Sequence, residues 1–214
     1  MAEIGIPFSD PIADGPVIQQ AATTALRNGM SLHKLFEQIK DMRKEIHIPL
    51  LLMGYLNVIL KYGFENFCQQ CNKCGIDGAI IPDLPFDIYM RDYKTIAQKY
   101  DINIIMLITP HTSDERIHLI DNNTKGFIYQ VSTDATTGAQ NSFGASTIEY
   151  FERIKAMHLN NPTLVGFGIS NKATLEATRL HSNGSIIGSK FVRLLQENDT
   201  PSQAVKALFE SLSK

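Results

Sequence analysis

The chain has 214 residues, a formal net charge of −2 and 43% hydrophobic residues. We expect residues 1–214 to form a single domain, because this length supports one substantial core. The near-neutral charge, without a basic stripe, disfavours binding to nucleic acid or to an anionic membrane. No apolar run approaches the ~20 residues of a membrane span, and the first residues do not resemble a secretory signal. We therefore expect a soluble, cytoplasmic protein.

After an opening loop, patterns typical of helices and strands alternate along the chain. Helices are predicted at 16–29, 31–45, 63–74, 87–100, 114–122, 146–159, 171–180, 190–196 and 202–212. Strands are predicted around Glu3 and at 48–53, 76–81, 102–108, 126–131, 163–165 and 185–187, with a loop at 54–57. The strands are continuous apolar runs, which indicates burial on both faces, as in a parallel sheet covered by helices.

The helix predicted at 31–45 is amphipathic and has a cap signal. Ser31 is expected to cap its first turn. Its apolar face would consist of Leu32, Leu35, Phe36 and Ile39.

Unusual residues cluster after the strands, whereas the segments before the strands are unremarkable. Those after the strands are Asp14, Asp83, Ser132, Thr137, Gly168 and Ser189. Function at the carboxyl ends of strands is typical of a (β/α)8 barrel or a doubly wound sheet. A flavodoxin-like or Rossmann sheet remains the alternative, but no G-x-G-x-x-G opens a helix after the first strand.

The stretch from Glu3 to Pro16 contains three carboxylates, three prolines and two glycines. Proline fixes φ and removes a donor, so the chain after Pro7 forms a stiff loop that presents Asp10 and Asp14 beside Glu3. Carboxylates held in a partly apolar setting are typical of acid and base chemistry. The alternative is a capping loop in which Asp10 and Asp14 accept backbone N–H groups.

Two neighbouring loops favour a phosphate site. Gly166-Phe167-Gly168 follows one strand, and Gly188-Ser189 follows the next and leads into a helix. Bare backbone amides and the positive end of a helix bind anions, and barrels often place such a site after their last two strands. Each glycine taken singly is explained by a tight turn.

Cys68, Cys71 and Cys74 have a spacing that resembles a metal site. They fall in a predicted helix on which Cys68 and Cys74 would point to different faces, with no fourth cysteine and no histidine at the spacing of a zinc site. We therefore expect no metal. Clustered, odd-numbered cysteines also disfavour an extracellular disulfide framework.

The stretch from Glu3 to Pro16 resembles, without a gap, the signature of the α subunit of tryptophan synthase. The resemblance extends over nearly all 214 residues. It implies an α/β fold, a (β/α)8 TIM barrel, and a lyase of tryptophan biosynthesis that splits indole-3-glycerol phosphate into indole and glyceraldehyde-3-phosphate. It also implies a tryptophan synthase β subunit as partner in an α2β2 tetramer, and no cofactor in this chain, pyridoxal phosphate being expected only in the β subunit.

The resemblance carries over to individual residues. Glu3 would shuttle protons, Asp14 would hold the indole nitrogen, and Tyr129 would hydrogen-bond Glu3. The positions implied to contact substrate or phosphate are Tyr55, Thr137, Gly138, Phe167, Gly168, Gly188 and Ser189. For Tyr55 and Tyr129 the alternative is a buried tyrosine satisfied by backbone.

Three segments are implied to move or to face the partner. Asp83 lies in the loop that signals between subunits, and Asp10 would also face the β subunit. The loop at 132–140 resembles a mobile lid in which Thr137 would bond Asp14 on closure. This sequence departs from the family within that loop, at Thr133-Asp134-Ala135, where many members have Arg or Ser, a small residue and Gly.

The family begins with a first strand and helix, whereas this chain starts just before Glu3. A barrel without strand 1 and its helix has two open edges, so we expect weakened stability, association through those edges and a loosely held Glu3. The alternative function is a truncated, catalytically impaired chain that only docks a β subunit. A different phosphate-binding barrel enzyme is a weaker alternative, because the opening motif is complete.

Overall fold

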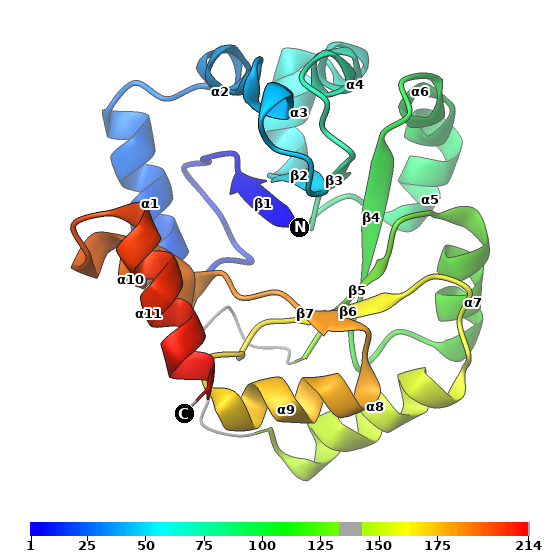
Figure 1. Cartoon of the computed structure of the whole chain (residues 1–214). Coiled ribbons are helices and arrows are strands. Elements are labelled where there is room, and N and C mark those ends of the chain that lie inside the picture. Colours follow the sequence, from blue (N-terminus) through cyan, green and yellow to red (C-terminus); the bar gives the residue numbers. More distant parts are fainter. Residues whose placement is uncertain (133–142, 214) are drawn as a thin grey trace. The chain divides into compact units, whose positions relative to one another are not determined.

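The computed structural model describes residues 1–132 and 143–213, and these residues form an α/β fold of parallel strands alternating with helices (Figure 1). By their contacts they divide into two compact units. Unit 1 contains residues 1–11, 21–106 and 124–126, and unit 2 contains residues 12–20, 107–123 and 127–214. The single domain expected for 1–214 stays a prediction.

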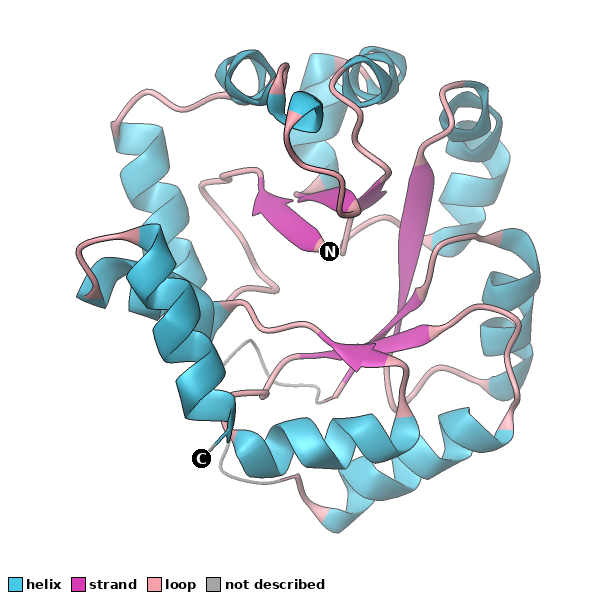
Figure 2. Ribbon diagram, in the orientation of Figure 1, coloured by secondary structure: helices cyan, strands magenta, loops and turns pink. Residues whose placement is uncertain are grey.

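Unit 1 is built on the first four strands, which run in chain order. These are β1 (Ala2–Gly5), β2 (Leu50–Met53), β3 (Gly78–Ile80) and β4 (Asn103–Ile108), the last continuing beyond unit 1 after Met106. Neighbouring strands pair in parallel, with Glu3 opposite Leu51 and Gly78 opposite Asn103. Helices α2, α4 and α6 cover one face of these strands (Figure 2). The helices are α1 (Pro16–Arg27, shared with unit 2), α2 (Leu32–Ile39), α3 (Leu56–Tyr62), α4 (Phe64–Lys73), α5 (Phe86–Ile88) and α6 (Lys94–Lys99).

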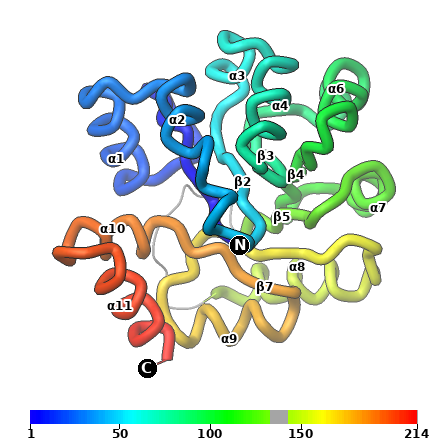
Figure 3. The backbone as a smooth tube through the Cα atoms, turned by 45° about the horizontal axis from the view of Figure 1, so that its top comes forward, coloured from blue at the N-terminus to red at the C-terminus, as the bar shows by residue number. Residues whose placement is uncertain are grey.

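Unit 2 contains a second set of parallel strands in chain order. These are β5 (Ile128–Val131), β6 (Thr163–Gly166) and β7 (Gly184–Ser185). Its helices are α7 (Asp114–Asn123), α8 (Ala145–Ala156), α9 (Lys172–His181), α10 (Ser189–Glu197) and α11 (Pro201–Ser213). Helices α10 and α11 lie side by side (Figure 3).

The strands β2 to β6 are mostly buried, as their continuous apolar sequences predict, whereas no residue of β1 or β7 is fully buried. Every residue of β3 and β5 is buried, and so are three of the four residues of β2. The cores centre on Leu52, Ile59, Phe67, Ile80 and Ile104 in unit 1, and on Ile117, Ile128, Phe151, Ile154 and Val165 in unit 2. No helix among the described residues is long and apolar enough to cross a membrane.

Three predicted elements need correction. The helix predicted at 31–45 has the expected cap, since Ser31 accepts the Lys34 N–H, and its four expected residues are buried, but it ends at Ile39. A separate 3₁₀ turn, η1 (Met42–Lys44), follows, because Arg43 is held there by acceptors in other segments.

The other two corrections concern unit 1 as well. The loop predicted at 54–57 extends only over Gly54 and Tyr55, and Leu56 begins the short helix α3 that the sequence analysis missed. The helix predicted at 87–100 is interrupted between α5 and α6 by a π-helical turn, η2 (Tyr89–Tyr93). Single π turns occur where a helix accommodates an extra residue, and here the aromatic rings of Tyr93 and Phe64 pack with centroids 4.3 Å apart.

Candidate active site

Glu3 lies on β1, half-buried, in a strand held by parallel pairing to β2. The pairing continues past the strand, where the Ile6 N–H donates to the Met53 carbonyl at 2.7 Å. Gly54 makes this close approach possible, because a Cβ there would lie 2.8 Å from the Ile6 Cβ. The backbone before and after Glu3 is therefore hydrogen-bonded to the β2 segment, and a loosely held Glu3 side chain stays a prediction.

Tyr55 follows β2, the strand that pairs with the Glu3 strand. Its side chain is 4% exposed, and its ring packs on Phe8 with centroids 5.3 Å apart. Both residues belong to unit 1, as Glu3 does. The structure thus places Tyr55 against the loop that follows the predicted catalytic strand.

The two residues predicted to face a partner, Asp10 and Asp83, are both exposed. Asp10 accepts a hydrogen bond from the Ser9 hydroxyl. The Asp83 carboxylate accepts the Leu56 N–H at 2.8 Å, which caps the first turn of α3 from the loop after β3. Asp83 therefore has a structural role within unit 1 besides the predicted one.

Asp14 is in unit 2 and is 7% exposed. Its carbonyl accepts the Gln19 side-chain amide at 2.7 Å, and it lies two residues before the start of α1. A carboxylate side chain at this level of burial requires partners, which is consistent with a role beyond a surface turn.

Tyr129, Gly166 and Phe167 form one packed cluster in unit 2. Tyr129 is 3% exposed on β5, and its ring meets that of Phe167 edge-on with centroids 6.0 Å apart. A Cβ on Gly166 would lie 1.9 Å from the Tyr129 hydroxyl oxygen. Only glycine fits at 166 with the ring in this position, so the tyrosine hydroxyl rests directly on the backbone of β6.

Phe167 and Gly168 both have left-handed backbone, with φ of 70° and 71°. This conformation is free for glycine, but it costs a residue with a Cβ about 1–2 kcal/mol. The Phe167 carbonyl is held by the Ser132 hydroxyl at 2.9 Å, and the Gly166 carbonyl is held by the Ser132 N–H at 3.3 Å. Ser132 at the end of β5 thus fixes the strained turn after β6.

The second predicted phosphate loop begins α10. Gly188 is the N-cap residue, and its carbonyl accepts the Val192 N–H at 3.0 Å. Apart from Gly188 and its chain neighbours, no atom of the described residues lies within 4 Å of the position where a Gly188 Cβ would be, so the space beside this turn is open. The open backbone and the helix start are what an anion site requires.

The sequence analysis missed Lys190, which connects the two phosphate loops. Its ammonium donates to the Ser170 carbonyl at 2.6 Å, so the first turn of α10 is tied to the loop after β6. A lysine directly after Gly188-Ser189 was the available signal.

The structure brings the predicted residues together in two sets. Glu3 and Tyr55 share unit 1, and Asp14, Tyr129, Phe167, Gly168, Gly188 and Ser189 share unit 2. The hydrogen bond expected between Glu3 and Tyr129 joins residues of different units and stays a prediction. Thr137, Gly138 and the departure at Thr133-Asp134-Ala135 lie outside the described residues.

Cys68, Cys71 and Cys74 are all buried and reduced. Cys68 and Cys74 are thus both buried, although they were expected to point to different faces of the helix. Burial raises the pKa of Cys68 to about 12 and also raises the pKa values of Cys71 and Cys74, so these thiols stay protonated and are poor metal ligands. Among residues 1–132 and 143–213, no group of three histidine, cysteine or acidic side chains is arranged to hold a metal.

Comparison with known proteins gives consistent matches over this sequence. The family model for the tryptophan synthase alpha chain matches residues 1–214. The chain is 63% identical to the tryptophan synthase alpha chain of Parabacteroides distasonis over 214 residues, which is all of this chain and 83% of that protein. It is 61% identical to that of Phocaeicola vulgatus over 213 residues, which is 99% of this chain and 83% of that protein.

Solved structures agree with the fold. The tryptophan synthase alpha subunit of Pyrococcus furiosus is 34% identical, with a TM-score of 0.86, and the match covers 98% of this chain and 84% of that one. A chain of the tryptophan synthase complex from the same organism matches with 33% identity, the same TM-score and the same coverage. The predicted fold class, an incomplete (β/α)8 barrel, is confirmed, with seven parallel strands among the described residues. The chain therefore belongs to the tryptophan synthase alpha chain family, a family of lyases of tryptophan biosynthesis.

Proposed function

We propose that this chain splits indole-3-glycerol phosphate into indole and glyceraldehyde-3-phosphate and that the indole passes to a tryptophan synthase β subunit. The observation that carries the proposal is the family match over all 214 residues, within which the stretch from Glu3 to Pro16 is complete. The side chains described above have the chemistry that this cleavage needs.

The reaction is a reversed aldol cleavage, which needs proton transfers. The bond between the ring carbon and the glycerol chain breaks, the ring carbon gains a proton, and the hydroxyl on the departing carbon loses one to become the aldehyde. Glu3 is the general acid and base for these transfers, with Tyr129 hydrogen-bonded to it. Asp14 accepts the indole N–H, which stabilises positive charge on the protonated ring.

Binding is assigned to the remaining residues. Tyr55 and Phe167 border the substrate, and Thr137 bonds Asp14 when the lid closes. Backbone amides at Gly138, Gly168, Gly188 and Ser189 hold the phosphate, and the start of α10 adds its positive end. The open space at Gly188 and the tie between the two loops support this assignment.

Because side chains perform the proton transfers, we expect the cleavage to need neither a metal nor an organic cofactor. Pyridoxal phosphate is assigned to the β subunit alone. The partner is docked through residues 7–16 and the Asp83 loop, with an α2β2 tetramer as the expected assembly. Exposure of Asp10 and Asp83 supports this docking surface. The cytoplasmic location stays a prediction.

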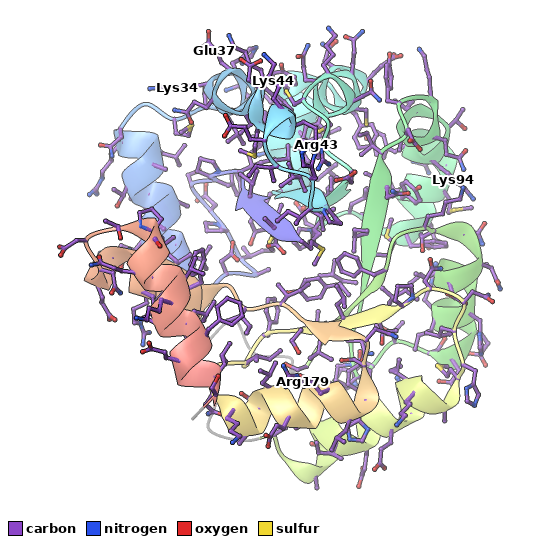
Figure 4. All side chains as sticks on the ribbon, viewed as in Figure 1. Lys34, Glu37, Arg43, Lys44, Lys94 and Arg179 are labelled. Carbon is purple, nitrogen blue, oxygen red and sulfur yellow. The ribbon has the colours of Figure 1, made fainter. Side chains whose placement is uncertain are left out.

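The test is indole release from indole-3-glycerol phosphate, with and without an added β subunit, for the unaltered chain and for Glu3→Gln. Removing a general acid and base typically lowers turnover by ~10²- to 10⁴-fold. We therefore expect Glu3→Gln to lower the rate of indole release by at least ~10²-fold. Glu37→Gln is the matched control, because Glu37 is exposed on α2 (Figure 4). Its release rate is expected to equal that of the unaltered chain.

Two outcomes would contradict the proposal. Equal release by the unaltered chain and Glu3→Gln would remove Glu3 from the chemistry. No release by either, together with stable binding to the β subunit, would leave only the alternative docking role.

A further inference from the structure

We propose that Lys190 is a positioning residue for the substrate phosphate, an inference that rests on the proposed function. Lys190 is the second residue of α10, directly after the Gly188-Ser189 turn. Its ammonium donates to the Ser170 carbonyl at 2.6 Å, and Ser170 is two residues after Gly168. This one side chain therefore connects the two loops whose backbone amides are proposed to hold the phosphate.

Ser170, whose carbonyl Lys190 binds, is itself held in place by hydrogen bonds. The Ser170 N–H donates to the Thr174 hydroxyl at 3.1 Å, and Asn171 forms a capping box with Thr174 at the start of α9. Thr174 is completely buried. Lys190 thus connects the open turn at Gly188 to an anchored turn after β6.

The charge of Lys190 is also not neutralised locally. Lys44, Lys99 and Lys206 each pair with a carboxylate within 4.0 Å. Among the described residues, Lys190 has no carboxylate partner, and the acceptor it does use is a neutral carbonyl. An ammonium has three donors, so at least one N–H group remains to face an anion.

These features act in the same direction. A phosphate at the start of α10 would meet the positive end of a nine-residue helix and an unneutralised ammonium in the same turn. The bond to Ser170 keeps the two loops together before the ligand arrives. Preorganisation of this kind raises affinity without a new contact to the reacting atoms.

Lys155 offers a matched control for the tie alone. Its ammonium donates to the Leu180 carbonyl at 2.8 Å, so it connects α8 to the end of α9 with the same kind of bond in the same unit. It touches neither phosphate loop. Lys155→Met therefore removes an equivalent lysine-to-carbonyl bond without altering the site.

The test measures the dissociation constant for inorganic phosphate by isothermal titration calorimetry in a phosphate-free buffer. Hydrogen bonds to charged groups support an effect of about 10- to 100-fold, so we expect Lys190→Met to weaken binding by at least tenfold. Lys190→Arg should keep affinity within about threefold, because it keeps both the charge and a donor. Lys155→Met should bind phosphate as the unaltered chain does.

A merely structural role for Lys190 would look different. In that case Lys190→Met and Lys155→Met would lower the melting temperature equally and leave phosphate affinity alone, which would overturn the inference. Absence of measurable phosphate binding by the unaltered chain would also overturn it.

Indole release separates this inference from the proposed function. We expect Lys190→Met to raise KM with kcat nearly unchanged. Glu3-dependent release with unaltered KM in Lys190→Met would refute the role of Lys190 alone. Phosphate binding that depends on Lys190 in a chain that releases no indole would instead refute the lyase and leave the phosphate site standing.

Discussion

The segments before the strands and those after them are built in opposite ways. Before β2 and β3, the Arg43 guanidinium donates to the carbonyls of Gly75 at 2.7 Å and Ile48 at 2.7 Å, and it pairs with Asp77. Asp77 in turn accepts the Leu50 N–H at 2.7 Å (Figure 4 labels Arg43). Arg43 thus links the segments before β2 and β3 to η1.

Unit 2 has a similar polar centre before β6. The Asp121 carboxylate is 4% exposed and accepts hydrogen bonds from the backbone and side chains of Asn160 and Asn161, at 2.8–3.0 Å. The Thr163 N–H is likewise held by the Asn183 side chain at 2.9 Å. The Asp121 carboxylate and the Thr163 N–H are thus both satisfied by internal partners.

The segments after the strands leave groups available instead. The space beside the turn at Gly188 is open, and Phe167 has strained backbone. Saturated polar groups stabilise, whereas open amides and strain are typical of binding sites. Substitutions before the strands should therefore change stability, and substitutions after them should change activity.

Asp121→Asn is expected to have the largest effect on stability, about 3 kcal/mol, because it removes a charged acceptor that four hydrogen bonds from Asn160 and Asn161 share. Urea denaturation measures this loss, and KM of the folded protein should not change. Asp114→Asn in the same helix is the control, since Asp114 is exposed and lies 3.9 Å from Arg153. Its change should stay below about 1 kcal/mol.

The pH dependence of stability also tests the role of the Asp121 carboxylate. Burial by itself would raise the pKa of the Asp121 carboxyl, but the hydrogen bonds from Asn160 and Asn161 outweigh it and hold the pKa below its ordinary value. A lowered folded-state pKa gives stability that is fully present above the unfolded value of about 3.9. That contribution is lost as pH falls through the folded-state pKa, so Asp121→Asn should flatten the acid limb of the stability curve. An unchanged acid limb would show that the carboxylate is not the group that titrates.

Gly166→Ala, unlike Asp121→Asn, should lower activity as well as stability. The new Cβ would lie 1.9 Å from the Tyr129 hydroxyl oxygen, so the ring must move. We expect a loss of about 1–3 kcal/mol in unfolding free energy and a fall in indole release beyond that explained by unfolding. Gly144→Ala is the control, because among the described residues, its chain neighbours apart, no atom lies within 4 Å of its Cβ position and only a helix cap changes. Full activity in Gly166→Ala would mean that the position of Tyr129 is immaterial.

Gln130→Leu is expected to stabilise the protein by about 1 kcal/mol. Gln130 on β5 is completely buried, and both polar atoms of its side-chain amide are without a hydrogen-bond partner in the described part of the chain. Replacing an unsatisfied polar group by an apolar one of similar size removes its desolvation penalty. Gln196→Leu, at an exposed position on α10, should change stability by less than about 0.5 kcal/mol. A destabilised Gln130→Leu would show that the amide is satisfied in solution.

The sequence predicts the repeating elements well because their signals are local. Continuous apolar runs identified the buried strands, and the Ser31 cap with its four apolar residues gave the start and buried face of α2. The end of α2 was missed because Arg43 is held by acceptors at Gly75 and Asp77, more than 30 residues away. The segments before the strands were judged unremarkable for the same reason, although they contain the centres at Arg43 and Asp121.

In the candidate site, too, some features have a local sequence signal and others depend on the fold. Glycines beside a helix start indicated the loops at Gly168 and Gly188, since a bare amide is visible in the sequence. The tie from Lys190 to Ser170 and the contact of Tyr129 with Gly166 depend on which strands are neighbours. Such contacts require the fold before they can be inferred.

The three cysteines provide a chemical reporter that the chain already contains. Cys68 and Cys71 are in α4 and Cys74 is its C-cap residue; all three belong to unit 1, and the sequence has no other cysteine. Since each thiol is buried and protonated, a thiol reagent reacts only when this region opens. The labelling rate of the unaltered protein therefore times the opening of unit 1 without an engineered probe, and a variant in unit 2 that speeds labelling would reveal that the two units unfold together.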